Sequence, residues 1–164
     1  MSGVIDRMRA SDWEQVREIY LQGIRTGHAT FETEAPSWER WDEAHLPIAR
    51  LVMREGGSVL GWAALSPVSK RQVYRGVAEV TVYVAENARG QGIGRVLLEA
   101  LIAEAEANGI WTLQASIFPE NVASVELHRR CGFREVGRRE RIAMLQNVWR
   151  DTLLLERRSK VNFE

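Results

Sequence analysis

The sequence has almost no cysteine, no long apolar run and no excess of charge of either sign. Cys131 is the single cysteine among 164 residues, so neither an internal disulfide nor a thiolate metal cluster can form. Lys plus Arg and Asp plus Glu both total 22, which argues against a general nucleic-acid binder, since such proteins usually carry a basic excess. The N-terminal stretch has no apolar core, and no run approaches the length of a membrane span. These absences predict a cytoplasmic protein without a metal, a nucleic-acid partner or a membrane partner.

Length and composition are those of an ordinary globular domain. A chain of 164 residues, 45% hydrophobic and 27% charged, is long enough to bury one sizeable core. We therefore expect a single domain over residues 1–164. The last residues, 157–164, are polar and are expected to fray, as chain ends commonly do unless other contacts hold them.

Helix and strand patterns follow each other in mixed order along the chain. Helices are expected from a Ser11–Glu14 capping box to about Arg25, after Ser37, after residue 92 and before Cys131. Strands are expected near residues 4–9, 51–54, 59–65, 77–84, 111–117, 135–144 and 148–155. This order predicts an α/β fold of mixed α+β character, with helices packed on a central twisted sheet.

Three alternating glycines, Gly90, Gly92 and Gly94, follow the apolar strand 77–84 and precede an amphipathic helix. Glycine allows close approach of a ligand and positive φ, and a helix start offers free N–H groups to an anion. The spacing does not fit the dinucleotide fingerprint, because Arg95 stands where the third glycine would be, and the Gly-Lys-Ser/Thr of a Walker loop is absent. The loop predicts another phosphate-bearing ligand; a tight turn without a ligand is the simpler alternative.

Glu79 is a carboxylate in an otherwise apolar strand. Burial of a carboxylate is costly unless the group is solvated or paired, so an exposed position or an ion pair with Arg75 would explain it. The functional alternative is a general base. An amine substrate arrives as ammonium and must lose a proton before it attacks a thioester, and a carboxylate can take that proton directly or through water. The four-residue spacing to Arg75 does not decide between these interpretations.

In combination, several motifs resemble the GNAT superfamily of acetyl-CoA-dependent N-acetyltransferases, and within it the phosphinothricin and methionine sulfone/sulfoximine acetyltransferases. The motifs are Ala29–Phe31, Arg75-Gly76, Glu79–Val84, Arg89–Gly94, Asn121-x-x-Ser124-x-x-x-His128, Cys131–Phe133 and Trp149–Asp151. The resemblance covers nearly the whole chain. It implies a central, mostly antiparallel twisted sheet, flanked by helices, that splays open beside strand 77–84 to admit the pantetheine arm of coenzyme A.

The resemblance also implies which residues bind the cofactor, acetyl-CoA. The glycine loop would hold the pyrophosphate through backbone N–H groups, and backbone groups late in strand 77–84 would meet the pantetheine and the acetyl carbonyl. An amide and a hydroxyl after strand 111–117 would add hydrogen bonds. The expected cofactor-binding residues are Val82, Tyr83, Val84, Arg89, Gly90, Gln91, Gly92, Ile93, Gly94, Arg95, Asn121 and Ser124.

Three residues are candidates for catalysis. The match to the family at Glu79 favours the general base there. His128 is a second candidate for acid/base work, although a lone histidine on a helix is more often structural, and Tyr83 would protonate the departing thiolate or merely pack. Cys131 precedes a helix-ending glycine and is expected to be a small buried residue, because no activating histidine and carboxylate surround it.

The acceptor side is expected to be built from the loops before strand 77–84 and from that strand itself. The expected substrate-binding residues are Phe31, Glu32, Thr33, Arg71, Arg75, Glu79, Val80 and Thr81. Arg71 or Arg75 would pair bidentately with an amino-acid carboxylate. The chain departs from the sulfone/sulfoximine pattern at Ser69 and Leu145, where that group carries Arg and Lys, so the identity of the acceptor stays open.

We therefore expect an enzyme that transfers acetyl from acetyl-CoA directly, in a ternary complex, to the primary amine of a small amino-acid-like acceptor. The resemblance implies a homodimer. One alternative is a protein N-terminal or lysine acetyltransferase, since Glu32 and Glu34 suit a basic peptide. Another is a non-catalytic module that binds acetyl-CoA, against which the presence of Glu79 argues.

Overall fold

The structure, a computed structural model, describes residues 3–162. One seven-stranded sheet runs through this part of the chain. Its strands lie in the order β1-β2-β3-β4-β5-β7-β6. Their bounds are β1 Val4–Arg7, β2 Leu51–Glu55, β3 Ser58–Pro67, β4 Val77–Val84, β5 Thr112–Ile117, β6 Arg134–Leu145 and β7 Val148–Arg158. Neighbours are antiparallel except for β4 and β5, which confirms the expected mostly antiparallel sheet.

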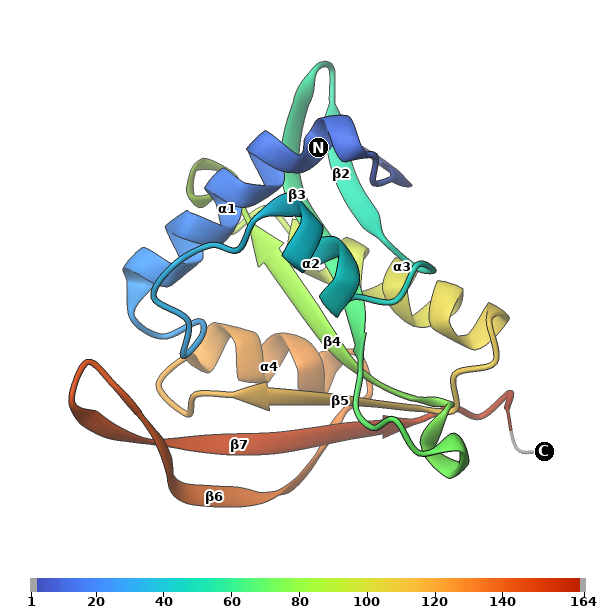
Figure 1. Ribbon diagram of the computed structural model, residues 1–164. Helices are drawn as coiled ribbons and strands as arrows, with labels where there is room; N and C mark the ends of the chain where they lie inside the picture. The colour runs from blue at the N-terminus through green and yellow to red at the C-terminus, as the bar shows by residue number, and fades with distance from the viewer. Residues whose placement is uncertain (1–2, 163–164) are drawn as a thin grey trace.

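Four α-helices flank the sheet within residues 3–162. They are α1 Trp13–Thr26, α2 Trp38–Ala44, α3 Ile93–Ala107 and α4 Val122–Arg130, with short 3-10 turns at Ala10–Asp12, Gln72–Tyr74 and Glu86–Ala88. Helices α1 and α2 lie in front of the upper strands in Figure 1, and α3 lies behind them. None of the described helices combines the length and the hydropathy that crossing a bilayer requires.

The sheet opens between β4 and β5. These two strands pair in parallel only at Val77–Glu79 with Thr112–Gln114, and beyond that point they diverge (Figure 1). Strand β4 stays paired with β3 along its whole length, whereas β5 continues as the partner of β7. The sheet is therefore V-shaped, with its apex at the Glu79–Gln114 pair, as the expected splay requires.

Apolar alternation along β4 decides which of its side chains enter the core. Ala78 and Val80 are buried and belong to the main hydrophobic cluster, together with Leu97 and Leu101 of α3. Because successive side chains of a strand point to opposite faces, Glu79 lies on the other face from Ala78 and Val80. Helix α3 thus fixes the back of β4, while the front of the strand is available for a site.

The start of α1 differs from the prediction. The capping box expected at Ser11 and Glu14 is wrong, because the α-helix begins at Trp13 after a 3-10 turn. The Asp12 carboxylate, which is almost fully buried, accepts a hydrogen bond from the backbone N–H of Arg9 at 2.8 Å. It also receives two hydrogen bonds from Arg54 of β2, at 2.7 and 3.0 Å. A long-range ion pair therefore replaces the local cap.

The expectation of a frayed tail over 157–164 is wrong for the residues that the structure describes. Strand β7 continues to Arg158, and Ser159 is 3% exposed. The side-chain amide of Asn162 donates to the backbone carbonyls of Glu106 and Ile110, at 2.9 and 3.0 Å. These contacts with the end of α3 hold the segment. Residues 163–164 lie outside the described part of the chain.

Candidate active site

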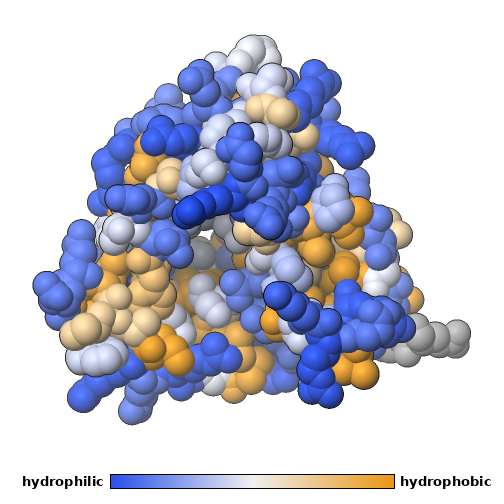
Figure 2. All heavy atoms as spheres, in the orientation of Figure 1, coloured by the Kyte–Doolittle hydropathy of each residue, from blue (hydrophilic) through white to orange (hydrophobic). Residues whose placement is uncertain are grey.

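A cleft of about 1660 Å³ occupies the opening between β4 and β5. Its walls come from both diverging strands, the glycine loop with the start of α3, helix α4, helix α2 and the loop over residues 27–36. Figure 2 shows the molecule hollowed near the middle of this face, between the region of α2 above and that of α4 below. The splayed sheet therefore brings segments from both halves of the chain to one cavity.

The cleft-facing edge of β4 is open beyond Glu79. Pairing with β5 ends at this residue, so the backbone groups that Val82, Tyr83 and Val84 direct toward β5 meet no strand there in the described chain. An open strand edge presents N–H and C=O groups in the spacing that an extended ligand can use, as in the addition of a further strand. These residues line the cleft.

The glycine loop combines two backbone constraints with one packing constraint. Gly90 and Gly92 adopt φ of 78° and 80°, in the left-handed region that favours glycine, and Gly92 is the residue before α3. A Cβ on Gly94 would lie 3.3 Å from Leu127 Cδ2 of α4, so a small residue there lets the two helices approach. No side chain caps α3, which leaves its first N–H groups for an anion.

Most of the expected cofactor-binding residues line this cleft. Arg89, Ile93 and Arg95 do so beside the three glycines, whereas Gln91 does not. Asn121 and Ser124 line it at the start of α4, and the side-chain oxygen Oδ1 of Asn121 accepts a hydrogen bond from the Ser124 backbone N–H at 3.3 Å. The Asn121 amide also donates to the His28 backbone carbonyl at 3.1 Å. Asn121 therefore caps α4 and ties the 27–36 loop across the cleft.

Glu79 stands at the apex of the sheet opening. Its carboxylate oxygen Oε1 accepts a hydrogen bond from Gln114 Nε2 at 2.9 Å, across the last paired residues of β4 and β5. Both side chains are partly buried, and Glu79 lines the cleft. Neither simple alternative from the sequence holds, since Glu79 is not on an exposed surface and Arg75 is not its partner.

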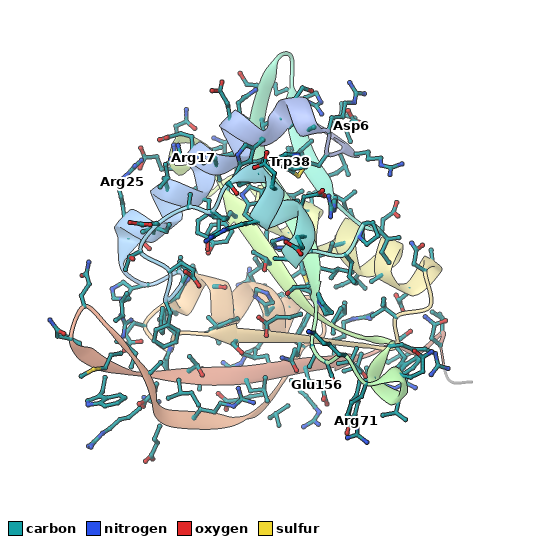
Figure 3. The ribbon with its side chains drawn as sticks, in the orientation of Figure 1. Asp6, Arg17, Arg25, Trp38, Arg71 and Glu156 are labelled. Atoms are coloured by element: carbon teal, nitrogen blue, oxygen red, sulfur yellow. The ribbon has the colours of Figure 1, made fainter. Side chains whose placement is uncertain are left out.

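The structure does not place Arg71 or Arg75 in the lining of the cleft, so it gives no support to their predicted role in acceptor binding. The Arg75 guanidinium lies 5.3 Å from the centre of the Trp111 ring, and that of Arg71 lies 5.3 Å from the centre of the Tyr74 ring. Figure 3 shows Arg71 at the lower right, away from α2 and α4. Both arginines are exposed, and they flank the 3-10 turn Gln72–Tyr74.

The other acceptor candidates divide in a similar way. Phe31, Glu32, Val80 and Thr81 line the cleft, whereas Thr33 does not. Phe31 packs edge-on against Phe118, which follows β5, with ring centres 4.8 Å apart. The two positions that depart from the sulfone/sulfoximine pattern, Ser69 and Leu145, are both outside the cleft lining.

Tyr83 is held in a stack of aromatic rings. Its ring centre lies 5.1 Å from those of Tyr20 of α1 and Trp62 of β3, with planes 15° apart in each pair, and Tyr20 and Trp62 are 6.1 Å from each other, so the three rings form a cluster. Burial raises the pKa of the Tyr83 phenol, so the group stays protonated at neutral pH. Gly23 of α1 faces the same ring, because a Cβ there would lie 2.4 Å from it. This packing accounts for Tyr83 without a proton-transfer role.

His128 and Cys131 have structural environments. His128 is 5% exposed, its Nδ1 lies 2.7 Å from the Ser124 carbonyl, and its ring packs edge-on against Phe133. Burial lowers the pKa of this imidazole and raises the pKa of the Cys131 thiol. Cys131 does not line the cleft. A neutral thiol outside the cleft agrees with the expectation of a small buried residue and gives no nucleophile.

Several residues of the cleft were not found from the sequence. Gln114 reaches Glu79 only because β5 pairs in parallel with β4, and no local sequence pattern predicts that pairing. Trp41 of α2 and Trp62 of β3, whose ring centres lie 5.6 Å apart and whose side chains are almost fully buried, also border the cleft. The tryptophan spacing in residues 38–41 predicted an apolar helix face but not that it would border a cavity. No cluster of potential metal ligands is present among residues 3–162.

The comparisons with known proteins match this fold and this cleft. The sequence pattern of the acetyltransferase (GNAT) family matches residues 13–133. Phosphinothricin N-acetyltransferase of Alcaligenes faecalis is 35% identical over 92% of this chain and 79% of its own. The L-methionine sulfoximine/L-methionine sulfone acetyltransferase of Salmonella typhimurium is 30% identical over 89% of this chain and 88% of its own.

Solved structures agree over nearly the whole chain. A phosphinothricin acetyltransferase from Sinorhizobium meliloti in complex with AcCoA has a TM-score of 0.86 and 29% identity, covering 96% of this chain and 89% of its own. The ribosomal-protein-alanine N-acetyltransferase from Brucella melitensis has a TM-score of 0.89 and 32% identity, covering 95% of this chain and 99% of its own. The similarity therefore includes the strands and loops that form the cleft.

Proposed function

This chain belongs to the GNAT family of acetyltransferases, and we propose that it transfers acetyl from acetyl-CoA to the primary amine of a small amino-acid-like acceptor. The observation that carries the proposal is the single cleft that joins the glycine loop, the open edge of β4 and Glu79. The relatives that acetylate phosphinothricin and methionine sulfoximine or sulfone support an acceptor of this size.

The chain's own groups fit the acetyl donor. The left-handed Gly90 and Gly92 leave backbone N–H groups before α3 without side-chain cover, which suits a pyrophosphate. The open edge of β4 at Val82–Val84 suits the amide groups of the pantetheine arm, and Asn121 lies opposite on α4. In this proposal the donor lies in the V of the sheet, with its phosphates at the glycine loop.

The proposed reaction is a direct transfer within a ternary complex. The amine nitrogen forms a bond to the thioester carbonyl carbon, the C–S bond breaks, and coenzyme A leaves as a thiol once it takes up a proton. Glu79 accepts the proton that the acceptor ammonium must lose, directly or through water, with Gln114 holding the carboxylate. Backbone N–H groups near Val82–Val84 stabilise the negative charge that develops on the carbonyl oxygen.

The remaining catalytic candidates have weaker support. Tyr83 has a protonated phenol that can supply the proton to the leaving thiolate, but its ring packs against two aromatic neighbours. His128 is buried and bound to the Ser124 carbonyl, so we assign it a structural role in α4. Cys131 lies outside the cleft lining, which favours direct transfer over an acetyl-cysteine route.

A Glu79→Gln variant tests the proposed base. With acetyl-CoA and a panel of amino acids, thiol release by the variant is expected to fall by a factor of about 10²–10⁴, a typical contribution of general base catalysis. Coenzyme A binding measured by calorimetry should be retained. Glu86→Gln is the matched control, because Glu86 is an exposed acid just beyond β4 and does not line the cleft. Unchanged transfer by Glu79→Gln would exclude the base.

Acetylation of a protein N-terminus is the second candidate. The resemblance to the ribosomal-protein-alanine N-acetyltransferase favours it, together with the acidic Glu32 and Glu34 on the cleft wall. A panel of short peptides, assayed beside the amino acids, separates the two functions. A higher kcat/KM for peptides than for every free amino acid would replace the small-molecule proposal.

We also propose that the chain forms a homodimer. The hairpin of β6 and β7 carries exposed apolar side chains near its turn, among them Ile142, Met144, Val148 and Trp149. Burial of such a patch against a second copy would stabilise a dimer. Light scattering coupled to size-exclusion chromatography measures the mass, and a monomeric mass at micromolar concentration would contradict this expectation.

A further inference from the structure

Several basic side chains line the cleft, and they differ in what already binds them. They are His28, Arg40, His45, Arg89, Arg95, His128 and Arg130. Arg95 of α3 pairs with Glu99 at 2.8 Å, and Arg130 of α4 pairs with Glu126 at 3.2 Å. These two arginines therefore have a carboxylate partner within their own helix.

The histidines of the cleft are already engaged by groups of the protein. Burial lowers the pKa of His45 and of His128, and the Nδ1 of each lies 2.7 Å from a backbone carbonyl. His28 Nδ1 lies 3.0 Å from the Arg150 guanidinium, which can only donate. The arginines of the cleft are therefore the candidates for pairing with an anionic group of an acceptor.

Arg89 and Arg40 remain, and they come from different segments of the cleft wall. Arg89 precedes the glycine loop, where the donor phosphates are proposed to lie. Arg40 belongs to α2, and its guanidinium makes no hydrogen bond or ion pair with the rest of residues 3–162. Arg40 is therefore the arginine of the cleft lining that has no carboxylate partner in the described part of the chain and does not adjoin the glycine loop.

Helix α2 holds this arginine on a fixed support. Ser37 caps the helix by accepting a hydrogen bond from the Arg40 backbone N–H at 3.2 Å. At the other end, the Arg50 guanidinium donates to the backbone carbonyls of Asp42, His45 and Leu46, at 2.9, 3.0 and 2.7 Å. A side chain on a helix fixed at both ends needs less ordering when it binds a ligand.

The walls around Arg40 complement a zwitterion. Glu79 and Glu32 line the same cleft from β4 and from the 27–36 loop, and neither forms an ion pair with Arg40. Trp41 and Trp62 also border the cleft, and both side chains are almost fully buried. An α-amino acid carries one ammonium and one carboxylate, and the cleft offers an opposite charge to each.

We propose that Arg40 binds the α-carboxylate of an amino-acid acceptor, while the amine of that acceptor faces Glu79. The inference rests on the proposed function and extends it by naming a residue that selects acceptors with a free carboxylate. It gives to Arg40 the role that the sequence predicted for Arg71 or Arg75. The planar guanidinium suits a bidentate pair with a carboxylate, which a lysine cannot reproduce.

The test measures acceptor kinetics with paired substrates. The best amino-acid acceptor of the wild-type protein and its α-carboxamide are assayed with Arg40→Gln, Arg40→Lys and Arg17→Gln. For Arg40→Gln, KM for the free amino acid is expected to rise about 10–100-fold, the range for loss of hydrogen bonds to a charged group, and KM for the carboxamide far less. Arg40→Lys should fall between. Arg17 is the control, an exposed arginine of α1 that does not line the cleft (Figure 3).

Each other outcome overturns the proposal. Equal changes of KM for both acceptors in Arg40→Gln would show that the carboxylate is not its partner. Transfer to carboxamides or peptides but to no free amino acid would overturn the role of Arg40 and leave acetyl transfer standing. No transfer to any acceptor would overturn this role and the proposed function together.

Discussion

Replacement of Gly92 by alanine is expected to weaken binding of coenzyme A far more than replacement of Gly94. Gly92 has φ of 80° and directly precedes α3, and nothing in the protein lies within 4 Å of an added Cβ. Strain at this position is therefore conformational and not steric. Gly94 lies inside α3, where its Cβ would meet only the end of the flexible Leu127 side chain, at 3.3 Å.

The magnitude follows from the backbone angle. An L-residue in the left-handed region costs roughly 1–2 kcal/mol. If the loop keeps its conformation, this cost lowers the melting temperature, by about 2–8 °C for a domain of this size. If the loop relaxes to negative φ, its N–H groups turn away from the phosphate site, and the same cost weakens binding about 5–30-fold. The loss of stability and the loss of binding free energy together should equal the roughly 1–2 kcal/mol cost of the left-handed conformation.

Two measurements decide this prediction. Calorimetry with coenzyme A gives the dissociation constant without any assumption about the acceptor, and thermal unfolding gives the stability of the free protein. Gly94→Ala is the matched control, because it adds the same methyl group two residues away without a positive φ. Gly92→Ala with unchanged affinity and unchanged melting temperature would refute the role of the left-handed loop, as would a larger effect for Gly94→Ala.

Two further predictions concern the pairs Asp12–Arg54 and Gln114–Glu79. Asp12→Asn should lower the free energy of unfolding at pH 7, measured by urea titration, by about 2–3 kcal/mol. The substitution breaks a mostly buried ion pair with Arg54, although Asp6 still reaches Arg54 at 3.1 Å. The hydrogen bonds from Arg54 lower the pKa of Asp12, so this stabilisation is present above the unfolded pKa of 3.8 and is lost as pH falls through the folded value. Gln114→Met should lower kcat about 5–30-fold, since it removes the donor that holds the Glu79 carboxylate, with little change in KM for acetyl-CoA.

Each of these predictions has a contradicting outcome. A difference in stability between Asp12→Asn and wild type that stays constant from pH 7 to pH 3 would show that the carboxylate charge is not responsible. For Gln114→Met, a lower melting temperature with unchanged kcat would show that the side chain supports the sheet without positioning Glu79. Both results can be read from the same purified variants.

Local signals in the sequence predicted the elements that border the donor end of the cleft. Strand β4 spans Val77–Val84 as predicted, because a run of alternating apolar residues between Gly76 and the glycine loop fits a buried strand. The three glycines predicted the loop directly from the sequence. Gly90 and Gly92 adopt positive φ, and Gly94 allows close packing. These signals need only near neighbours in the chain.

The acceptor end was predicted less well because it depends on distant segments. Arg71 and Arg75 lie close to Glu79 in the sequence, yet neither lines the cleft, and Arg75 lies over Trp111. Arg40 lies 39 positions before Glu79 and reaches the same cleft through the packing of α2. The tail shows the same dependence, since Asn162 is held by carbonyls at the end of α3.

The apex of the sheet explains why one strand can serve both substrates. Pairing of β4 with β5 stops at Glu79 and Gln114, so Glu79 is the last β4 residue that the closed part of the sheet still holds. From the next residue onward the edge of β4 is open, and the donor is proposed to use that edge. A base placed further along the strand would lose its partner on β5, and one placed earlier would be enclosed by both strands. A carboxylate on β4 that is held by β5 and also borders the cleft can therefore lie only where the pairing of the two strands ends. Glu79 lies at that position.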